Sequence, residues 1–126
     1  MMVSAKITGF EVKRILVDSG SAVEVLSWGA YKEMGLKGQS LSVASPLYSF
    51  VNHPVEVRGT VTLAVTLGDV EHTTIECVQF YVVNHSIAYN AIFGRPIMRM
   101  INMVMTTYCI KIKFPTSTGV GYLRSN

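Results

Sequence analysis

The stretch that decides the fold is Arg14-Ile15-Leu16-Val17-Asp18-Ser19-Gly20-Ser21, an apolar run that ends in an acid, a hydroxyl and a glycine. A short run of Ile, Leu and Val bounded by turn-forming residues predicts a buried strand. Asp18 then follows that strand in a tight loop beside the core. Because Asp, Ser and Gly are also the commonest turn residues, an ordinary turn is the alternative interpretation of this triplet.

A second apolar run closed by glycine lies far downstream, at Tyr89-Asn90-Ala91-Ile92-Phe93-Gly94-Arg95-Pro96. The two runs form a matched pair. Together they resemble the retropepsins, the aspartic proteases of retroviruses and long-terminal-repeat retrotransposons, and most closely those of plant gypsy-type elements. The resemblance covers nearly the whole chain in the right order, over 21–26, 31–36, 89–96 and 113–116.

Length and composition predict one soluble domain, 1–126. The chain has 126 residues, of which 49% are hydrophobic and 15% charged, which suits a single core. No apolar run approaches the roughly 20 residues needed to cross a bilayer. The N-terminus lacks the basic flank and long apolar stretch of a secretory signal. We therefore expect a cytoplasmic protein without a membrane partner.

The charged residues and the cysteines argue against two other kinds of site. The net charge is +3, but the basic residues are scattered through the sequence, whereas nucleic-acid binding needs a clustered footprint. Cys77 and Cys109 lie far apart in apolar runs, without the short Cys or His spacings of a zinc site. We expect both to be buried free thiols, and we expect neither a cofactor nor a metal.

Short strands dominate the remaining pattern. A hairpin is predicted around 8–9, and a second one joins 61–67 to 70–83. In 70–83 the apolar positions change parity after Cys77. A bulge, or a strand buried on both faces, would explain that change. The other predicted elements are an extended segment over 22–26, a hairpin with its tip near Asn52 and His53, a last strand over 108–114 and a turn over 115–119. On its local pattern the hairpin could be any surface hairpin, but its position between the Asp18 loop and the Gly94 loop favours a flap.

One or two short helices complete the predicted elements. Ser27 is expected to cap the first, which Gly35 ends, and Pro96 suits the first turn of the second. Many closely spaced short strands without a βαβ rhythm predict an all-β, closed, barrel-like sheet. The resemblance implies the retropepsin version of that fold, with a flap.

The chemistry of carboxylates predicts a homodimer. Peptide hydrolysis needs one ionised carboxylate to accept a proton from water and one neutral carboxyl to donate a proton to the substrate carbonyl. The only other Asp is Asp69, in a predicted hairpin turn, and no glutamate follows an apolar run that closes on glycine. The second acid must therefore come from a second copy, across a two-fold axis between the Asp18 loops.

The resemblance also implies roles for single residues. It makes Asp18 the catalytic acid, Ser19 the hydroxyl that braces the two loops across the dimer, and Gly20 the point where backbone approaches backbone. It makes Gly94 and Arg95 structural supports, with Arg95 tying the second helix to acidic or backbone groups near the Asp18 loop. The substrate-binding positions that it implies, on the cleft wall, the flap and the pockets, are Ala22, Tyr48, Phe50, Val51, Asn52, His53 and Ile92.

The predicted function is an aspartic endopeptidase that processes its own retrotransposon polyprotein at extended segments with apolar residues. Two departures from the family pattern support an alternative, a catalytically silent dimerisation or peptide-binding module. Ala22 and Val23 replace an acid, which leaves Glu24 as the nearest carboxylate for Arg95. His53 stands where related flaps usually have glycine, which restricts the backbone. The intact Asp18 triplet favours the enzyme.

Overall fold

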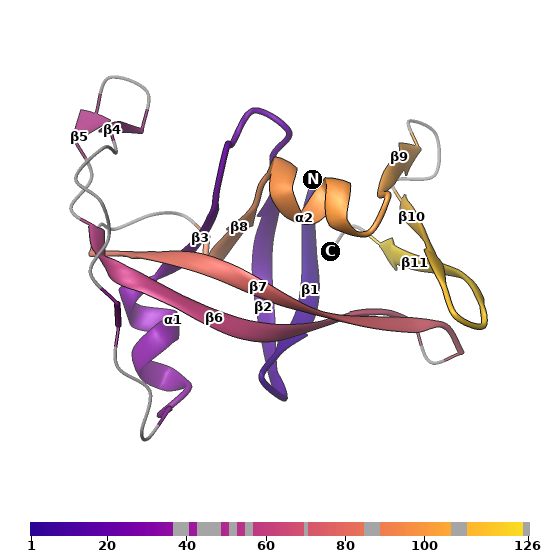
Figure 1. Ribbon diagram of the computed structural model, residues 1–126, viewed down its shortest axis with the longest axis horizontal. Helices are drawn as coiled ribbons and strands as arrows, with labels where there is room; N and C mark the ends of the chain where they lie inside the picture. The colour runs from indigo at the N-terminus through magenta and orange to yellow at the C-terminus, as the bar shows by residue number, and fades with distance from the viewer. Residues whose placement is uncertain are drawn as a thin grey trace.

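A closed six-stranded β-barrel forms the centre of the molecule (Figure 1). The computed structural model describes residues 1–36, 41–42, 49–50, 53–54, 57–69, 71–84, 89–106 and 111–124. In the order in which they pair, the barrel strands are β1 (Met2–Ile7), β2 (Phe10–Val17), β8 (Ala91–Phe93), β3 (Glu24–Ser27), β7 (Thr73–Val83) and β6 (Val57–Gly68). Strand β6 pairs back with β1 and closes the barrel.

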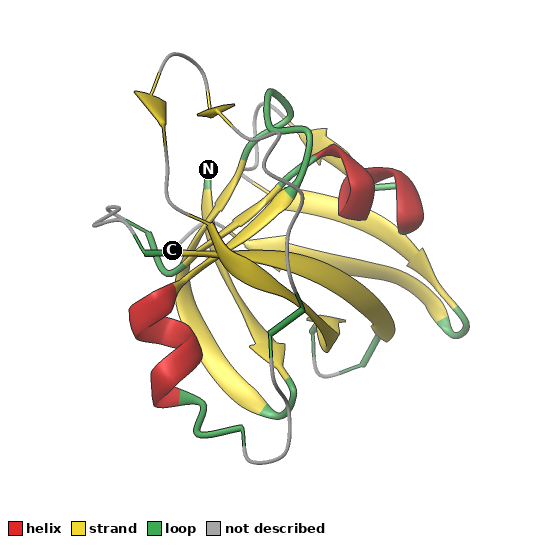
Figure 2. Cartoon of the chain, turned by 60° about the vertical axis from the view of Figure 1, so that its left-hand side comes forward, coloured by secondary structure: helices red, strands yellow, loops and turns green. Residues whose placement is uncertain are grey.

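Two smaller sheets and two short helices surround the barrel. The helices α1 (Trp28–Glu33) and α2 (Arg95–Met100) lie apart on its outside (Figure 2). Neither described helix has the length or the apolar character to span a membrane. The predicted all-β class with one or two short helices is confirmed. The smaller sheets consist of β4 (Ser49–Phe50) with β5 (His53–Pro54), and of β9 (Val104–Thr106), β10 (Lys111–Thr116) and β11 (Gly119–Arg124).

The first hairpin turns where the sequence predicts it. Thr8 and Gly9 both have positive φ, 48° and 83°, and a two-residue turn of this kind matches the twist of the strands that it joins. The hairpin delivers β2 into the barrel with Ile15 fully buried. The loop after Val17 therefore hangs from a strand that is paired on both sides, with β1 and β8.

The long hairpin of β6 and β7 corrects two predictions. Its register is continuous from Gly59 opposite Val82 to Gly68 opposite Thr73, so the bulge or doubly buried strand predicted near Cys77 is wrong. Apolar residues simply continue onto the outer face, where Ile75 is 64% exposed. Cys77 is exposed for the same reason, and the prediction that it is buried is wrong. Cys109 lies outside the described residues.

Both helices begin as predicted. The Ser27 hydroxyl accepts a hydrogen bond from the Ala30 N–H at 3.1 Å, which satisfies one of the donors left free at a helix start. Gly35 follows α1 with φ of 55°, and Pro96 lies in the first turn of α2. Because α2 follows β8 directly, its first turn is placed by the barrel.

The C-terminal sheet differs from the prediction. Pro115 belongs to β10 and pairs with Val120 of β11, so the turn is confined to 117–118 and the prediction of a turn over 115–119 is wrong. Neither β9 nor β11 is predicted from the sequence. Phe114 and Leu123 join the buried cluster of the barrel, which packs this sheet onto the main core.

Candidate active site

The two runs that the sequence singles out lie side by side. Strand β2 pairs in parallel with β8, and Val17 is opposite Phe93. The Asp18 N–H donates to the Phe93 carbonyl at 2.9 Å. Phe93 itself is fully buried, with its ring centroid 6.4 Å from that of Phe80. The core of the barrel therefore holds the start of the Asp18 loop.

Hydrogen bonds within the loop orient the Asp18 carboxylate. The Gly20 N–H donates to Oδ1 of Asp18 at 2.8 Å, and the Ser21 N–H donates to the Asp18 carbonyl at 3.1 Å. A Cβ on Gly20 would lie 3.1 Å from that Oδ1. Asp18 is half-buried, while Ser19 and Gly20 are exposed. The loop thus offers an oriented carboxylate at the surface.

The segment after β8 packs directly against the far side of the loop. A Cβ on Gly94 would lie 2.5 Å from the Val23 carbonyl oxygen and 2.7 Å from that of Ser21, so only glycine fits this approach. The Arg95 N–H donates to the Ser21 carbonyl at 2.9 Å. Its Nη1 donates to the Ser19 carbonyl at 3.1 Å. Arg95 therefore reaches a backbone group of the Asp18 loop.

Glu24 is a further part of the site, although the sequence indicates it only as a partner for Arg95. Its side chain is 3% exposed, and its Oε2 accepts hydrogen bonds from the Gly94 N–H at 3.0 Å and the Ile97 N–H at 3.2 Å. Burial raises the pKa of Glu24 above its ordinary 4.5, against the opposing effect of these donors. The sequence contains one sign of this role, which is an acid inside the otherwise apolar run 22–26.

The predicted substrate-binding residues are only partly described. Ile92 is half-buried in β8, opposite Leu16 and Val25. Ala22 is exposed beyond the loop and lines a surface pocket of about 510 Å³ between 22–24, β7 and α2.

Of the predicted flap hairpin, the structure describes the backbone of two residues on each arm, Ser49–Phe50 and His53–Pro54. Phe50 of β4 pairs with His53 of β5, whereas Tyr48, Val51 and Asn52 lie outside the described residues. Both β4–β5 and the loop between β2 and β3 rise above the barrel in Figures 1 and 2. The Asp18 loop and the described parts of this hairpin therefore lie on the same side of the barrel.

Asp69 does not contribute to the site. It lies at the turn between β6 and β7, at the far end of the long hairpin (Figure 1). Its Oδ1 accepts the N–H groups of Glu71 and His72 at 3.0 and 2.8 Å. The His72 N–H is the main cause that lowers the Asp69 pKa below 3.8. The described part of one chain thus places one Asp, Asp18, at the site.

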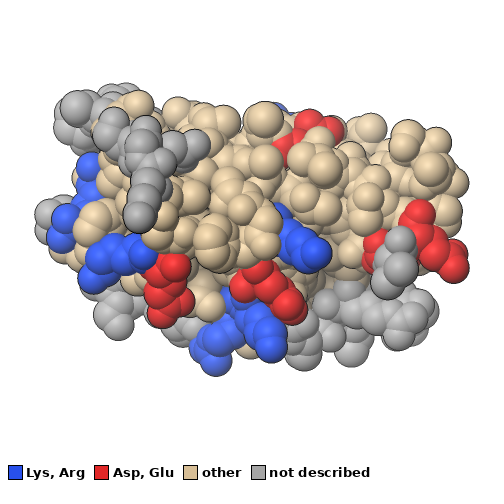
Figure 3. Space-filling view, turned by 90° about the horizontal axis from the view of Figure 1, so that it is seen from below, with Lys and Arg blue, Asp and Glu red and all other residues tan. Residues whose placement is uncertain are grey.

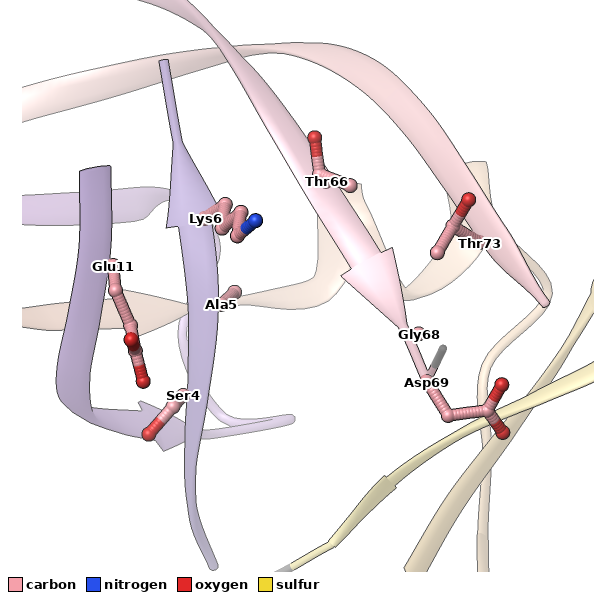
Figure 4. A pocket seen from close by; sticks show the side chains of 8 residues that line it. All are labelled: Ser4, Ala5, Lys6, Glu11, Thr66, Gly68, Asp69 and Thr73. Atoms are coloured by element: carbon pink, nitrogen blue, oxygen red, sulfur yellow. The ribbon is translucent and has the colours of Figure 1, made fainter. Parts of the chain in front are cut away.

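A larger surface pocket lies away from the Asp18 loop. It has a volume of about 550 Å³ and lies between β1, β2 and the tip of the long hairpin, where Lys6, Glu11 and Asp69 line it (Figure 4). On the face shown in Figure 3, basic and acidic side chains lie next to one another. Among the described residues, no group of three His, Cys, Asp or Glu side chains could hold a metal ion.

No family model and no curated protein matches the sequence. The structure is similar to the retroviral protease-like domain of Ddi1 from Leishmania major, with a TM-score of 0.74, 20% identity, and coverage of 100% of this chain and 95% of that one. The fold is retropepsin-like.

A second solved structure agrees with this retropepsin-like fold. A retropepsin-like aspartic protease from Rickettsia conorii matches with a TM-score of 0.61 and 13% identity, over 97% of this chain and 79% of that one. Identities this low show the fold alone. The fold prediction is confirmed, and origin from a plant gypsy-type element stays a prediction.

Proposed function

We propose that this chain is an aspartic endopeptidase whose catalytic site forms when two copies bring their Asp18 loops together. The observation that carries the proposal is the position of Asp18 in a retropepsin-like fold. The acid follows a buried strand, is anchored to Phe93 through its N–H, and is oriented by Gly20 at a partly exposed loop. An acid held in this way is oriented and accessible to a substrate, which supports the proposal.

The proposed mechanism needs one proton shared between two Asp18 carboxylates. Two like charges within hydrogen-bonding distance cannot both ionise readily, so the proposed pair holds one proton between its two carboxylates. The ionised member accepts a proton from the attacking water. The neutral member donates its proton to the substrate carbonyl oxygen as the tetrahedral intermediate forms.

The proposed substrate is an extended polypeptide with apolar residues at the scissile bond. In support, Ile92 presents a half-buried apolar side chain in the strand next to the Asp18 strand. The sequence resemblance over 21–26, 31–36, 89–96 and 113–116 extends the proposal to the chain's own retrotransposon polyprotein, of plant gypsy type, processed in the cytoplasm.

The decisive substitution is Asp18→Asn, with Asp69→Asn as its control. Asp18→Asn removes the shared proton while changing little volume, so we expect turnover of a peptide library to fall by at least about 10³-fold. The melting temperature should stay near that of the wild type. Asp69→Asn removes the same charge outside the site and should leave turnover within about two-fold.

Two outcomes would contradict the proposal. Cleavage by Asp18→Asn at the wild-type rate would show that another group does the chemistry. Saturable binding of peptides by the wild-type protein without cleavage would support the alternative, a silent peptide-binding module.

A further inference from the structure

Glu24 is a buried acid that joins two separate segments of the site. It begins β3, and together with Thr60 it accounts for the buried polar side chains of the described residues. Its partners, the N–H groups of Gly94 and Ile97, lie about seventy residues further along the chain. A buried carboxylate is costly unless it is hydrogen-bonded, so this placement needs a reason.

The first segment that Glu24 holds is the start of α2. The N-terminal cap of α2 is Gly94, which has no side chain to accept a hydrogen bond from the first turn. Helix starts leave backbone N–H groups without partners, and a buried one needs an acceptor. Glu24 supplies that acceptor from β3. Removing it leaves the Ile97 N–H without its described partner.

The second segment is the Asp18 loop, which this helix start holds at three points. Phe93, directly before Gly94, accepts the Asp18 N–H. Arg95, directly after it, donates its N–H to the Ser21 carbonyl and its Nη1 to the Ser19 carbonyl. Any shift of 93–97 therefore moves the backbone on both sides of Asp18.

We propose that Glu24 is a positioning residue for the catalytic loop, because its carboxylate fixes 94–97 against β3 and so fixes the direction of the Asp18 side chain. This inference rests on the proposed function where it speaks of catalysis. The placement of the loop by Glu24 is a separate, structural statement. A displacement of about 1 Å at a reacting group costs a large factor in rate, so the loss should appear in turnover.

Two substitutions distinguish the effect of the hydrogen bonds from the effect of side-chain length. Glu24→Gln keeps an oxygen acceptor. Glu24→Met keeps the length of the side chain but removes the acceptor. Glu33→Gln is the matched control, because Glu33 is exposed on α1. All proteins are assayed on one peptide substrate at concentrations where specific activity no longer rises. Thermal melts establish that each variant is folded at the assay temperature.

The expected result is a graded loss in kcat. Neutral hydrogen bonds are weaker than charge-assisted ones, so Glu24→Gln should lower kcat about three-fold and Glu24→Met at least about ten-fold. KM should stay within about two-fold in both, because neither variant touches the substrate. Glu33→Gln should match the wild type.

Hydrogen exchange tests the placement without any activity. The Asp18 and Arg95 amides should exchange faster, by about three-fold in Glu24→Gln and at least about ten-fold in Glu24→Met, while amides of the β6–β7 ladder keep their rates. Unchanged exchange at Asp18 in the folded variants would overturn the inference. If Glu24→Met does not fold, the same comparison is made with Glu24→Gln alone.

The two readouts distinguish the two proposals. If the wild-type protein cleaves nothing, the proposed function fails and exchange alone decides the role of Glu24. If the wild-type protein is active and Glu24→Met retains its kcat, Glu24 does not position the catalytic group, even where exchange is faster.

Discussion

At the scale of single residues, the site depends on one glycine that allows close backbone contact. A methyl group at Gly94 would meet the Val23 and Ser21 carbonyl oxygens at 2.5 and 2.7 Å. Backbone atoms cannot move aside as a flexible side chain can. Gly94→Ala should therefore lower the free energy of unfolding by about 1–3 kcal/mol, as measured by urea denaturation.

Gly29 provides the matched control for this prediction. It lies in α1, and a Cβ there would meet nothing within 4 Å. Gly29→Ala should raise the free energy of unfolding by up to about 1 kcal/mol, because alanine favours the helix. Equal effects of the two substitutions would show that the contact at 21–23 does not restrict residue 94.

A second residue-scale prediction concerns Glu24 and pH. Burial raises its pKa in the folded protein above the ordinary 4.5, so the folded state binds this proton more tightly than the unfolded state. The stability that comes from this group is complete below about pH 4.5 and is lost as pH rises through the higher folded pKa. Glu24→Gln has no titratable proton at this position and should lose this part of the pH dependence. Urea denaturation of both proteins between pH 4 and 8 measures the difference, and parallel curves would contradict it.

The sequence could predict some of these residues and not others. Asp18 and Gly94 are visible because each follows an apolar run, and such runs mark strand ends. The sequence indicates Glu24 only as an ion-pair partner, because no local pattern shows that its carboxylate will meet amides seventy residues away. Cys77 was misjudged because apolar neighbours in the sequence do not show which face of the strand they occupy.

At the scale of elements, the β6–β7 turn is fastened to the β10–β11 turn. Nδ1 of His72 is hydrogen-bonded to Oγ1 of Thr118 at 2.9 Å, and a Cβ on Gly119 would lie 2.9 Å from the His72 ring. The glycine therefore leaves room for the imidazole. This contact supplements the burial of Phe114 in joining the C-terminal sheet to the barrel.

A double-mutant cycle of His72→Ala and Thr118→Val tests this connection. Residues in direct contact couple, and for this exposed pair we expect about 0.5–1 kcal/mol in the free energy of unfolding. Ser117→Ala, in the same turn, replaces Thr118→Val in a control cycle and should show no coupling with His72→Ala. Additive effects of His72→Ala and Thr118→Val would mean that the turns are held by the sheets alone.

Elements were predictable where local chemistry determines them. The Thr8-Gly9 turn and the Ser27 cap each follow from a residue type in a known position. Pro115 misled the prediction because proline usually marks a turn, yet β9 pairs with β10 only as far as Lys113. Beyond that point only β11 is paired with β10 in the described structure, and proline is tolerated at such an edge.

At the scale of the whole molecule, strand order creates the site. Strands β2 and β8 are neighbours in the barrel although more than seventy residues separate them. Residue patterns predict a barrel but not which strands meet, because pairing between distant strands leaves no local signal. At the sequence level, the retropepsin resemblance paired only the Asp18 run with the run that ends at Gly94, and the two structural neighbours agree with the fold.

The last prediction follows from the number of acids. The described part of one chain places a single Asp at the site, and the proposed mechanism needs two. A monomer should be inert, so specific activity should rise with protein concentration through the dimer dissociation constant and then level off. Sedimentation measured over the same concentrations should give the same midpoint.

Mixing experiments make this prediction specific to Asp18. An excess of Asp18→Asn chains should inhibit the wild type, because each mixed dimer has one competent acid, and a nine-fold excess should reduce the activity per wild-type chain about ten-fold. Asp69→Asn chains, which keep both acids at the site, should not inhibit. Constant specific activity from a protein that sediments as a monomer would show that one chain carries a complete site, and the two-fold arrangement of Asp18 would then be wrong.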